Sequence, residues 1–539
     1  MTDVMPEAAN PVETDYEIGQ DNIEGQLGPF GFDIHNPVFL ISGLAIVAFV
    51  FYALAFQEQA AAVFGAMRPW LTSTFDWFFL LAANIFVLFC LFLIVSPWGK
   101  VRLGGPDAVP EYSYTGWFAM LFAAGMGIGL MFFGVLEPVY HMAVSQPLGT
   151  PSPFAEDGSV IAANVEAAKE MGLAATIYHW GLHPWAIYAI VALALALFTF
   201  NKGLPLTIRS AFFPIFGDRV WGWTGHIIDT LAVFATLFGL ATSLGFGAQQ
   251  ANAGLEHVFG IPNNTTVQVL LITFITSIAL FSVLRGLDGG VKLLSEINMG
   301  IAALLLLFVL FVGPTMMILT DFGQGMVAYV RDLVPLSNPF GRTDDSYREG
   351  WTAFYWAWWI SWSPFVGMFI ARVSRGRTVR EFITCVLIIP SIVCVLWMAV
   401  FGGVAIDQVL SDPAASMVKQ NVIDNYNPPL SLFAMLEGLP LSSITSVIGI
   451  VLVIVFFVTS SDSGSLVIDT ITAGGKVDAP VPQRVFWATF EGAVAIVLLL
   501  GGGLAALQAM VISTGLPFTL VLLLMCVAIV KGLQSEPRT

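Results

Sequence analysis

Four tryptophans lie close together in the segment FYWAWWISWSPF, residues 354–365. They are Trp356, Trp358, Trp359 and Trp362. Residues three and four apart share one face of a helix, so Trp362 lies beside Trp358 and Trp359. Tryptophan also gathers where a membrane meets water, and that explanation suffices for Trp356, near the start of its apolar segment. Trp359 and Trp362 lie deeper, so their rings are candidates for binding.

A second aromatic set occurs in YHWGLHPWAIY, residues 178–188. On a helix, Trp180, Trp185 and Tyr188 fall within an arc of about 140°, so all three can face one cavity. Aromatic cages bind quaternary ammonium groups, and each ring contributes about 0.5–2 kcal/mol as a cation–π partner. A trimethylammonium group has no N–H to leave unsatisfied on burial, whereas a lysine-like ammonium does. The two aromatic sets therefore predict a site for an onium group.

A run of alternating glycines could bind a negatively charged group on the same substrate. In AAGMGIGLMFFG, residues 123–134, Gly125, Gly127 and Gly129 each weaken a helix by about 1 kcal/mol relative to alanine. Unwound backbone from Gly125 through Met126 to Gly129 can offer N–H groups and a helix-end dipole to a carboxylate. Close packing of helices is an equally good explanation of the glycines. Because the run holds no acidic residue, a zwitterion fits it better than a pure cation.

A metal site is a competing hypothesis. His179 and His183 are four residues apart, as are Glu137 and His141, and this spacing can chelate a metal on a helix. A metal-dependent membrane enzyme would follow. The sequence shows no further cluster of His or carboxylate residues that completes a ligand set, so we expect polar satisfaction instead, and no cofactor. A channel is a second alternative, since hydroxyl-lined helices conduct ions, but it leaves the aromatic cage unexplained.

The elements that position these residues are membrane helices. The chain of 539 residues is 57% hydrophobic and 11% charged, against roughly 25% charged residues in soluble domains. Apolar runs long enough to cross a bilayer as a helix, about 20 residues, recur throughout. We expect twelve spans: 37–57, 75–97, 114–142, 172–199, 225–254, 266–284, 293–320, 350–373, 381–404, 441–471, 483–501 and 505–531. No run alternates with period two, as barrel strands do, so the predicted fold is an all-α polytopic membrane protein.

The distribution of charged residues predicts the orientation of the chain in the membrane and where its terminal tails lie. Most of the 21 Lys and Arg residues fall in loops on the side of the two termini, which predicts that both termini are cytoplasmic. Residues 1–36 carry acidic residues without Lys or Arg, so we expect a disordered acidic tail rather than a signal peptide. Residues 37–531 then form the transmembrane domain, and residues 532–539 a short tail. The net charge of −16 argues against nucleic acid as a partner.

Polar interruptions suggest an internal repeat. Besides the glycine run of the third span, the eighth span carries Ser361, Ser363 and Pro364, and the tenth carries a hydroxyl run that starts at Thr459. The fifth span has a polar break within residues 235–247. Spans three and eight are five apart, as are spans five and ten. Paired interruptions are typical of transporters, so we expect two five-helix repeats, about 114–320 and 350–531, after two leading helices.

Two segments resemble signatures of the betaine/choline/carnitine transporter family. They are GMGIGLMFFGVLEP, residues 125–138, and WTAFYWAWWISWSPFVGMFIARVSRGRTVREF, residues 351–382. The resemblance implies an inverted five-plus-five helix repeat, a homotrimer in the bacterial inner membrane, and import of a zwitterionic onium compound by alternating access. Glycine betaine and dimethylsulfoniopropionate are both open as substrates.

The resemblance also implies roles for individual residues. It matches Trp180, Trp185, Tyr188 and Trp359 to an aromatic box around the onium group, and Trp362 to a neighbour of the carboxylate. It implies a sodium site made by Ala123, Met126, Phe456, Thr459 and Ser460, whose hard oxygen ligands suit a small cation. A second sodium site would use Thr236 and Phe365, but Leu240 stands where a hydroxyl is expected.

The coupling ion follows from the same resemblance. GMGIG at residues 125–129 resembles the sodium-coupled betaine members, whereas proton-coupled choline members carry an acid in that motif. Sodium symport is therefore expected, and a proton-coupled or exchange-type choline or carnitine transporter of the same fold is the alternative.

Overall fold

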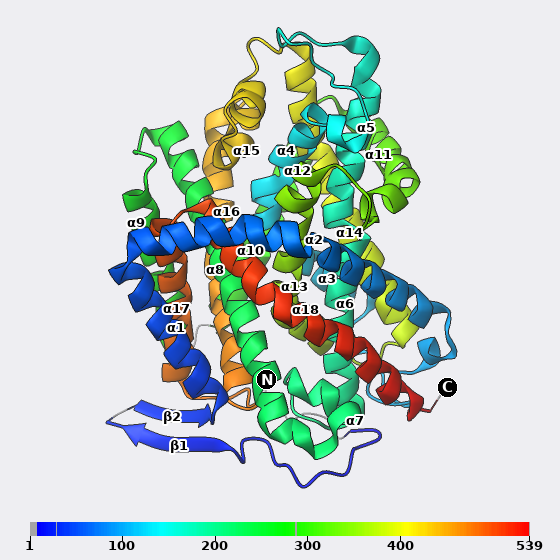
Figure 1. The fold of residues 1–539 in the computed structure, drawn as a ribbon, viewed down its shortest axis with the longest axis vertical. Helices are drawn as coiled ribbons and strands as arrows, with labels where there is room; N and C mark the ends of the chain where they lie inside the picture. The colour runs from blue at the N-terminus through cyan, green and yellow to red at the C-terminus, as the bar shows by residue number, and fades with distance from the viewer. Residues whose placement is uncertain (1–7, 29, 286–287, 538–539) are drawn as a thin grey trace.

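The computed structural model describes residues 8–28, 30–285 and 288–537, and it is a helical bundle with one small hairpin at its end (Figure 1). The first half of the bundle contains α1 (Val38–Ala55), α2 (Gln57–Val95), α3 (Tyr114–Gly125), α4 (Ile128–Ala143), α5 (Ala162–Trp180), α6 (Leu182–Ala196), α7 (Phe213–Phe216), α8 (Trp223–Phe259), α9 (Thr265–Arg285) and α10 (Asp288–Val312). The second half contains α11 (Thr315–Ser337), α12 (Asp345–Tyr347), α13 (Ala353–Arg372), α14 (Val379–Ser411), α15 (Ser431–Glu437), α16 (Ser442–Thr472), α17 (Val481–Leu500) and α18 (Leu504–Gln534). The hairpin is β1 (Asn22–Leu27) and β2 (Phe30–His35).

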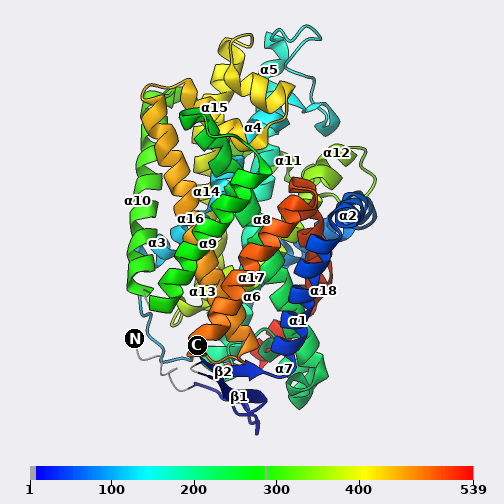
Figure 2. The same ribbon diagram turned by 90° about the vertical axis from the view of Figure 1, so that its left-hand side faces the viewer.

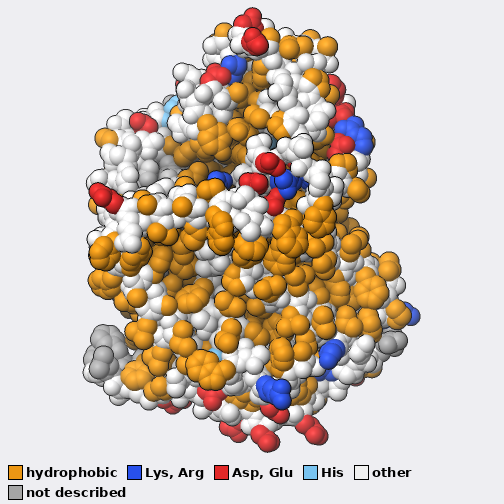
Figure 3. Space-filling model, in the orientation of Figure 1, with side chains coloured by type: hydrophobic (Ala, Val, Ile, Leu, Met, Phe, Trp, Pro, Cys, Tyr) orange, Lys and Arg blue, Asp and Glu red, His pale blue; other side chains and the backbone are white. Residues whose placement is uncertain are grey.

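The helices confirm a polytopic membrane protein. In the part of the chain that the structure describes, 10 helices are long and apolar enough to cross a membrane, and the count is 11 if the bent pair of α3 and α4 is one span. Helix α13 overlaps the predicted eighth span but is not in this set, because its tryptophans, serines and proline lower its mean hydropathy. Figure 3 shows hydrophobic side chains covering the middle of one face, with charged side chains toward its upper part and lower rim. The count of twelve stays a prediction.

The expected break in the third span is present. Helix α3 ends at Gly125, α4 begins at Ile128, and their axes differ by 66°. Gly127 between them has extended backbone, with φ 179° and ψ −170°. The fourth span has a short interruption that the sequence analysis missed, at Gly181 between α5 and α6.

The interruptions expected in the fifth, eighth and tenth spans were wrong, because α8, α13 and α16 are continuous helices. The polar side chains bond to their own helix instead of opening it. The Ser363 hydroxyl donates at 2.6 Å to the Ile360 carbonyl, which is the carbonyl that Pro364, four residues on, has no N–H to satisfy. Thr459 donates in the same way to the Val455 carbonyl, four residues back, at 3.0 Å. The two-repeat organisation therefore loses its argument from paired breaks and stays a prediction.

The first residues of the chain differ from the expected disorder. Strands β1 and β2 pair antiparallel, with Asn22 opposite His35, at the end of the bundle where the C-terminus also lies (Figure 2). Cations of the bundle hold the acidic segment in place: Lys476 Nζ lies 2.5 Å from Asp33 and 3.0 Å from Glu24. Composition alone could not show these partners, which are more than 400 positions away in the sequence. Residues 1–7 lie outside the described residues.

Arg209 is the main anchor of this segment. Its guanidinium donates to the Tyr16 hydroxyl at 2.7 Å and to His35 Nε2 at 2.8 Å, and all of its side chain is buried. An imidazole that accepts from a guanidinium must be neutral. Burial, followed by the charges of Arg209 and His226, lowers the pKa of His35 from its ordinary 6.5 to about 3.

We therefore expect the hairpin to loosen in acid. Between pH 6.5 and about 3 the undocked segment binds a proton at His35 that the docked segment does not. Docking then weakens by about 1.4 kcal/mol for each pH unit below 6.5. Hydrogen exchange of β1 and β2 as a function of pH measures this change. His35→Gln should flatten the profile, whereas His257→Gln, at the far end of α8, should not; identical profiles for His35→Gln and the unmodified chain would contradict the assignment.

Candidate functional site

The break between α3 and α4 exposes backbone groups of both signs. The last carbonyls of a helix and the first N–H groups of the next have no partner within their own helix. Here the carbonyl end of α3 and the amide end of α4 meet at Gly125 to Ile128, within a bundle where water is scarce. The two ends carry partial charges of opposite sign, so one can attract a cation and the other an anion.

The amide end of α4 forms one wall of a cavity whose other walls are aromatic. The lining residues are Ala124, Gly125, Met126, Gly127, Ile128, Gly129, Leu130, Trp180, Tyr188, Ser243, Trp358, Trp359, Trp362 and Val366. Nine of the ten residues that the sequence analysis assigned to the substrate are in this set. The exception is Trp185, which is fully buried behind the wall, against Tyr188 and Gly125.

The aromatic rings meet edge to face. The Trp359 ring centroid lies 5.2 Å from that of Trp180, at 86°, and 5.3 Å from that of Tyr188, at 70°. Trp185 supports Tyr188 from behind at 5.3 Å and 80°. This arrangement turns ring faces and edges in several directions around one space, which is how a cage surrounds a cation. Trp180 comes from the end of α5, Tyr188 from α6 and Trp359 from α13.

Hydrogen bonds fix the orientation of the indoles. Trp359 Nε1 donates to the His179 carbonyl at 3.1 Å. Trp358 Nε1 donates to the Ser243 hydroxyl of α8, and Trp362 Nε1 to the Gly239 carbonyl, both at 3.0 Å. Because each N–H has a protein partner, the rings present their apolar faces to the cavity. Ser243 was missed by the sequence analysis, since one serine in a polar break gives no sign of which ring it bonds.

Two indole rings lie against Gly129 and leave no room for a larger side chain. A Cβ at this position would lie 2.9 Å from Trp180 Cη2 and 3.0 Å from Trp358 Cη2. Both distances are shorter than ordinary contacts between carbon atoms. The glycine therefore brings the amide end of α4 up to the cage, which is a more specific role than the general helix packing considered from the sequence.

A second cavity adjoins the first on the carbonyl side of the break. It is lined by Ala123, Ala124, Met126, Gly127, Ser295, Met299, Trp362, Phe365, Val366, Phe369, Phe456, Thr459, Ser460 and Ser463. All five residues of the first predicted sodium site are in this set, so the structure brings α3 and α16 together as that prediction requires. The two cavities share five lining residues, which are Ala124, Met126, Gly127, Trp362 and Val366.

The second predicted sodium site is not brought together in the same way. Phe365 lines the cavity just described, but Thr236 does not, and its hydroxyl donates to the Ala232 carbonyl at 2.7 Å. The Leu240 side chain packs against α16 at Gly464. Leucine thus fills the place where the family pattern expects a hydroxyl.

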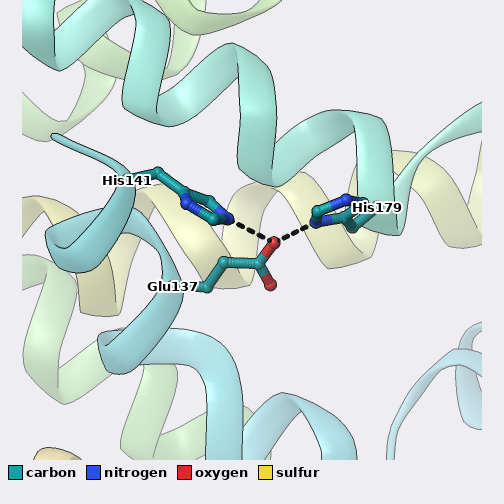
Figure 4. A group of neighbouring side chains, drawn as sticks. All are labelled: Glu137, His141 and His179. Carbon is teal, nitrogen blue, oxygen red and sulfur yellow. Dashed lines mark hydrogen bonds and ion pairs between the residues drawn. The ribbon is translucent and has the colours of Figure 1, made fainter. Parts of the chain in front are cut away.

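A buried carboxylate lies behind the cage. Glu137 Oε2 accepts from Trp180 Nε1 at 2.7 Å and from the Tyr355 hydroxyl at 2.6 Å. Its Oε1 lies 2.5 Å from His179 Nδ1 and 3.3 Å from His141 Nε2 (Figure 4). Both carboxylate oxygens thus serve several protein groups, and the carboxylate fixes a ring of the cage.

These contacts also involve the residues of the alternative metal site. Glu137, His141 and His179 are close enough for their ligand atoms to lie within 4.8 Å of one another. His183 lies apart, with Nε2 3.0 Å from Asn84 Oδ1. His179 Nε2 is 2.9 Å from the Thr352 hydroxyl, so both nitrogens of this ring have protein partners. Protein partners therefore account for both nitrogens of His179, and polar satisfaction without a metal stays a prediction for the cluster.

Removing the Glu137 carboxylate should destabilise the protein. Glu137→Leu leaves the Trp180 and Tyr355 donors without an acceptor, at a cost of about 1–3 kcal/mol for each. Glu137→Gln keeps an acceptor oxygen and should cost less. Thermal unfolding in detergent measures both, with Glu437→Leu at a half-exposed position as the control, expected to change stability by about 0.5 kcal/mol or less. A Glu137→Leu protein as stable as the unmodified chain would disprove the role.

Comparison with known proteins places this geometry in a family. The family model described as betaine/carnitine/choline family transporter matches residues 37–538. The chain is 62% identical over 534 residues to a glycine betaine/proline/choline transporter of Vibrio parahaemolyticus, covering 98% of this chain and 95% of that protein. It is 56% identical over 529 residues to glycine betaine transporter 1 of the same organism, covering 97% of each. It is 44% identical over 510 residues to the glycine betaine transporter OpuD of Bacillus subtilis, covering 91% of this chain and 95% of that protein. The chain therefore belongs to the betaine/carnitine/choline transporter family.

Proposed function

We propose that the protein imports glycine betaine, or a closely similar zwitterionic onium compound, by sodium symport with alternating access. Membership of the family makes the chain a transporter and not an enzyme, which removes the metal-dependent enzyme from consideration. Three relatives that match most of the chain are transporters named for glycine betaine. The location in a bacterial inner membrane and the homotrimer are predictions that rest on the family resemblance, and the cytoplasmic termini are a prediction from the distribution of Lys and Arg.

The observation that carries the proposal is the shape of the first cavity. Aromatic faces of Trp180, Tyr188 and Trp359 stand on one side, and the amide end of α4 stands on another. A substrate with a methylated cation at one end and a carboxylate at the other matches both walls. A cation without the carboxylate leaves the amide end without a partner, and an amine with N–H groups loses hydrogen bonds in the cage.

The second cavity supports sodium as the coupling ion. Ala123 and Met126 at the end of α3, and Thr459 and Ser460 of α16, line this cavity, and in this proposal their carbonyl and hydroxyl oxygens bind the ion. These are hard oxygen ligands, which suit a small hydrated cation. Since Met126 and Gly127 line both cavities, an ion on one side of the break and a substrate on the other act on the same backbone. Each would then raise the affinity for the other by the same factor.

The role of the cage is tested at Trp359. Trp359→Ala should weaken glycine betaine binding by about 1–3 kcal/mol, through loss of a desolvated cation–π partner and its packing. Trp356→Phe is the matched control: Trp356 lies on the same helix but faces Tyr178 and His183 instead of the cavity. Isothermal titration of the purified proteins measures both affinities. Unchanged affinity in folded Trp359→Ala protein would refute the cage.

The role of sodium is tested at Thr459. Thr459→Ala should raise the sodium concentration that gives half-maximal uptake by reconstituted protein, and should affect glycine betaine affinity less at saturating sodium. Thr489→Ala, an exposed threonine on α17 whose hydroxyl also bonds to its own helix, is the control. Uptake that ignores sodium and follows an imposed proton gradient would overturn sodium coupling and favour the proton-coupled alternative.

A further inference from the structure

The amide end of α4 is held only loosely by its own helix. Its first backbone hydrogen bond, from the Met131 N–H to the Gly127 carbonyl, is long at 3.4 Å. Gly127, which precedes the helix, has no side chain with which to cap the free N–H groups. The residues that carry these groups, 128–130, line the first cavity. A site that uses their N–H groups therefore requires other parts of the protein to fix the position of this turn.

An indole of α14 holds the turn on one side. Trp397 Nε1 donates to the Leu130 carbonyl at 3.0 Å, and Trp397 is buried. Its ring stacks on Phe401 of the same helix, with ring centroids 4.3 Å apart and planes at 17°. Gly134 makes room for this approach, because a Cβ there would lie 2.6 Å from Trp397 Nε1. The ring is thus supported by α14 while its N–H reaches α4.

A carboxamide of α8 holds the same turn from another helix. Gln250 Nε2 donates to the Met131 carbonyl at 2.7 Å, and Gln250 is fully buried. Because the Met131 carbonyl can only accept, the nitrogen of the amide must be the atom that faces it. The Gln250 Oε1 atom has no hydrogen-bond partner among the described residues. A buried oxygen without a partner is destabilising, so the contribution of glutamine at this position lies in its Nε2 donor.

We propose that Trp397 and Gln250 are positioning residues for substrate recognition, which fix the amide end of α4 so that its N–H groups meet the substrate carboxylate. Neither residue lines the first cavity, so each acts through α4 and not by touching the substrate. Their acceptors are successive carbonyls, which lie about 100° apart around a helix axis. Two bonds in different directions resist both sliding and rotation of the turn. This inference rests on the proposed binding of a zwitterion.

The bond from Trp397 also acts on the hydrogen bonding of the turn itself. A hydrogen bond to a carbonyl polarises its peptide unit and strengthens the bond that the N–H of the same unit makes. The Leu130 carbonyl shares its peptide unit with the Met131 N–H, whose bond to Gly127 is the long one. Loss of the Trp397 donor should therefore loosen the first turn of α4.

The cage should be less sensitive to such a loss. Its rings have hydrogen bonds of their own, such as that from Trp359 Nε1 to the His179 carbonyl. A displaced turn should therefore weaken recognition of the carboxylate more than recognition of the onium group. A structural defect alone would weaken both or neither.

Two onium probes separate these effects, because glycine betaine carries a carboxylate and choline does not. Both affinities are measured on purified protein in saturating sodium, glycine betaine by isothermal titration and choline by its displacement of radiolabelled glycine betaine. Trp397→Phe keeps an aromatic ring on Phe401 but removes the donor, and Gln250→Met keeps the length of the side chain. Each should weaken glycine betaine binding about fivefold, within the range of one lost hydrogen bond, and choline binding less than about twofold.

Trp487→Phe is the matched control. Trp487 on α17 is also fully buried, and its Nε1 donates to Thr472 Oγ1 at 2.9 Å. The control therefore loses an equivalent hydrogen bond at a residue that lines neither cavity. It should leave both affinities unchanged, whatever its loss of thermal stability.

The remaining outcomes separate the possible failures. If the ratio of the two affinities is the same in both variants as in the unmodified chain, the positioning roles are wrong and the proposed function stands. If the unmodified chain binds choline as tightly as glycine betaine, the amide end does not recognise a carboxylate, and this inference fails together with the zwitterionic substrate. If one variant does not fold, the other decides the test. If neither folds, Phe401→Leu, which removes the stacking partner of Trp397, replaces them, and an unchanged ratio there overturns the role of Trp397.

Discussion

A membrane helix must satisfy the hydrogen bonds of its own backbone, and the rest of the structure depends on the break between α3 and α4, where this rule is not met. At Gly125 to Ile128 the chain turns by 66° between two helices, and residues of this break line both cavities. An irregular backbone is tolerated within a bilayer only where other groups serve it. In our account a cation binds carbonyl oxygens at the end of α3 and the substrate carboxylate binds the amide end of α4, so each of the two interacts with one side of the break.

The aromatic cage depends on the same break. Gly129 lets Trp180 and Trp358 approach the amide end of α4, and Glu137, two turns further along α4, bonds to the Trp180 indole. Two residues of α4 therefore contact the Trp180 ring, one at its edge and the other at its N–H. A change in the angle between α3 and α4 would move the cage and the ion ligands together, which is the physical basis for coupling two sites through one element.

The sequence predicted which residues line a common cavity better than it predicted the helices around that cavity. Aromatic spacing and the glycine run were local patterns, and nine of ten assigned residues line one cavity. The runs of Ser and Thr led to a wrong prediction of helix breaks. A hydroxyl residue that interrupts a helix cannot be told from the sequence apart from one that bonds to its own helix, and Ser363 and Thr459 do the latter. The docked hairpin and the contacts of Glu137 depend on partners far away in the chain, such as Lys476 for Asp33 and Tyr355 for Glu137, and composition does not reveal such pairs.

If ion and substrate bind the two sides of one broken helix, sodium should raise the affinity of the unmodified protein for glycine betaine, and titration with and without sodium measures this effect. The titration is made in saturating sodium and again with potassium in place of sodium at the same ionic strength, in buffer without choline. The ratio of the two affinities gives the coupling free energy. We expect affinity at least fivefold higher in sodium, or about 1 kcal/mol of coupling. Equal affinity in the two salts would contradict the account.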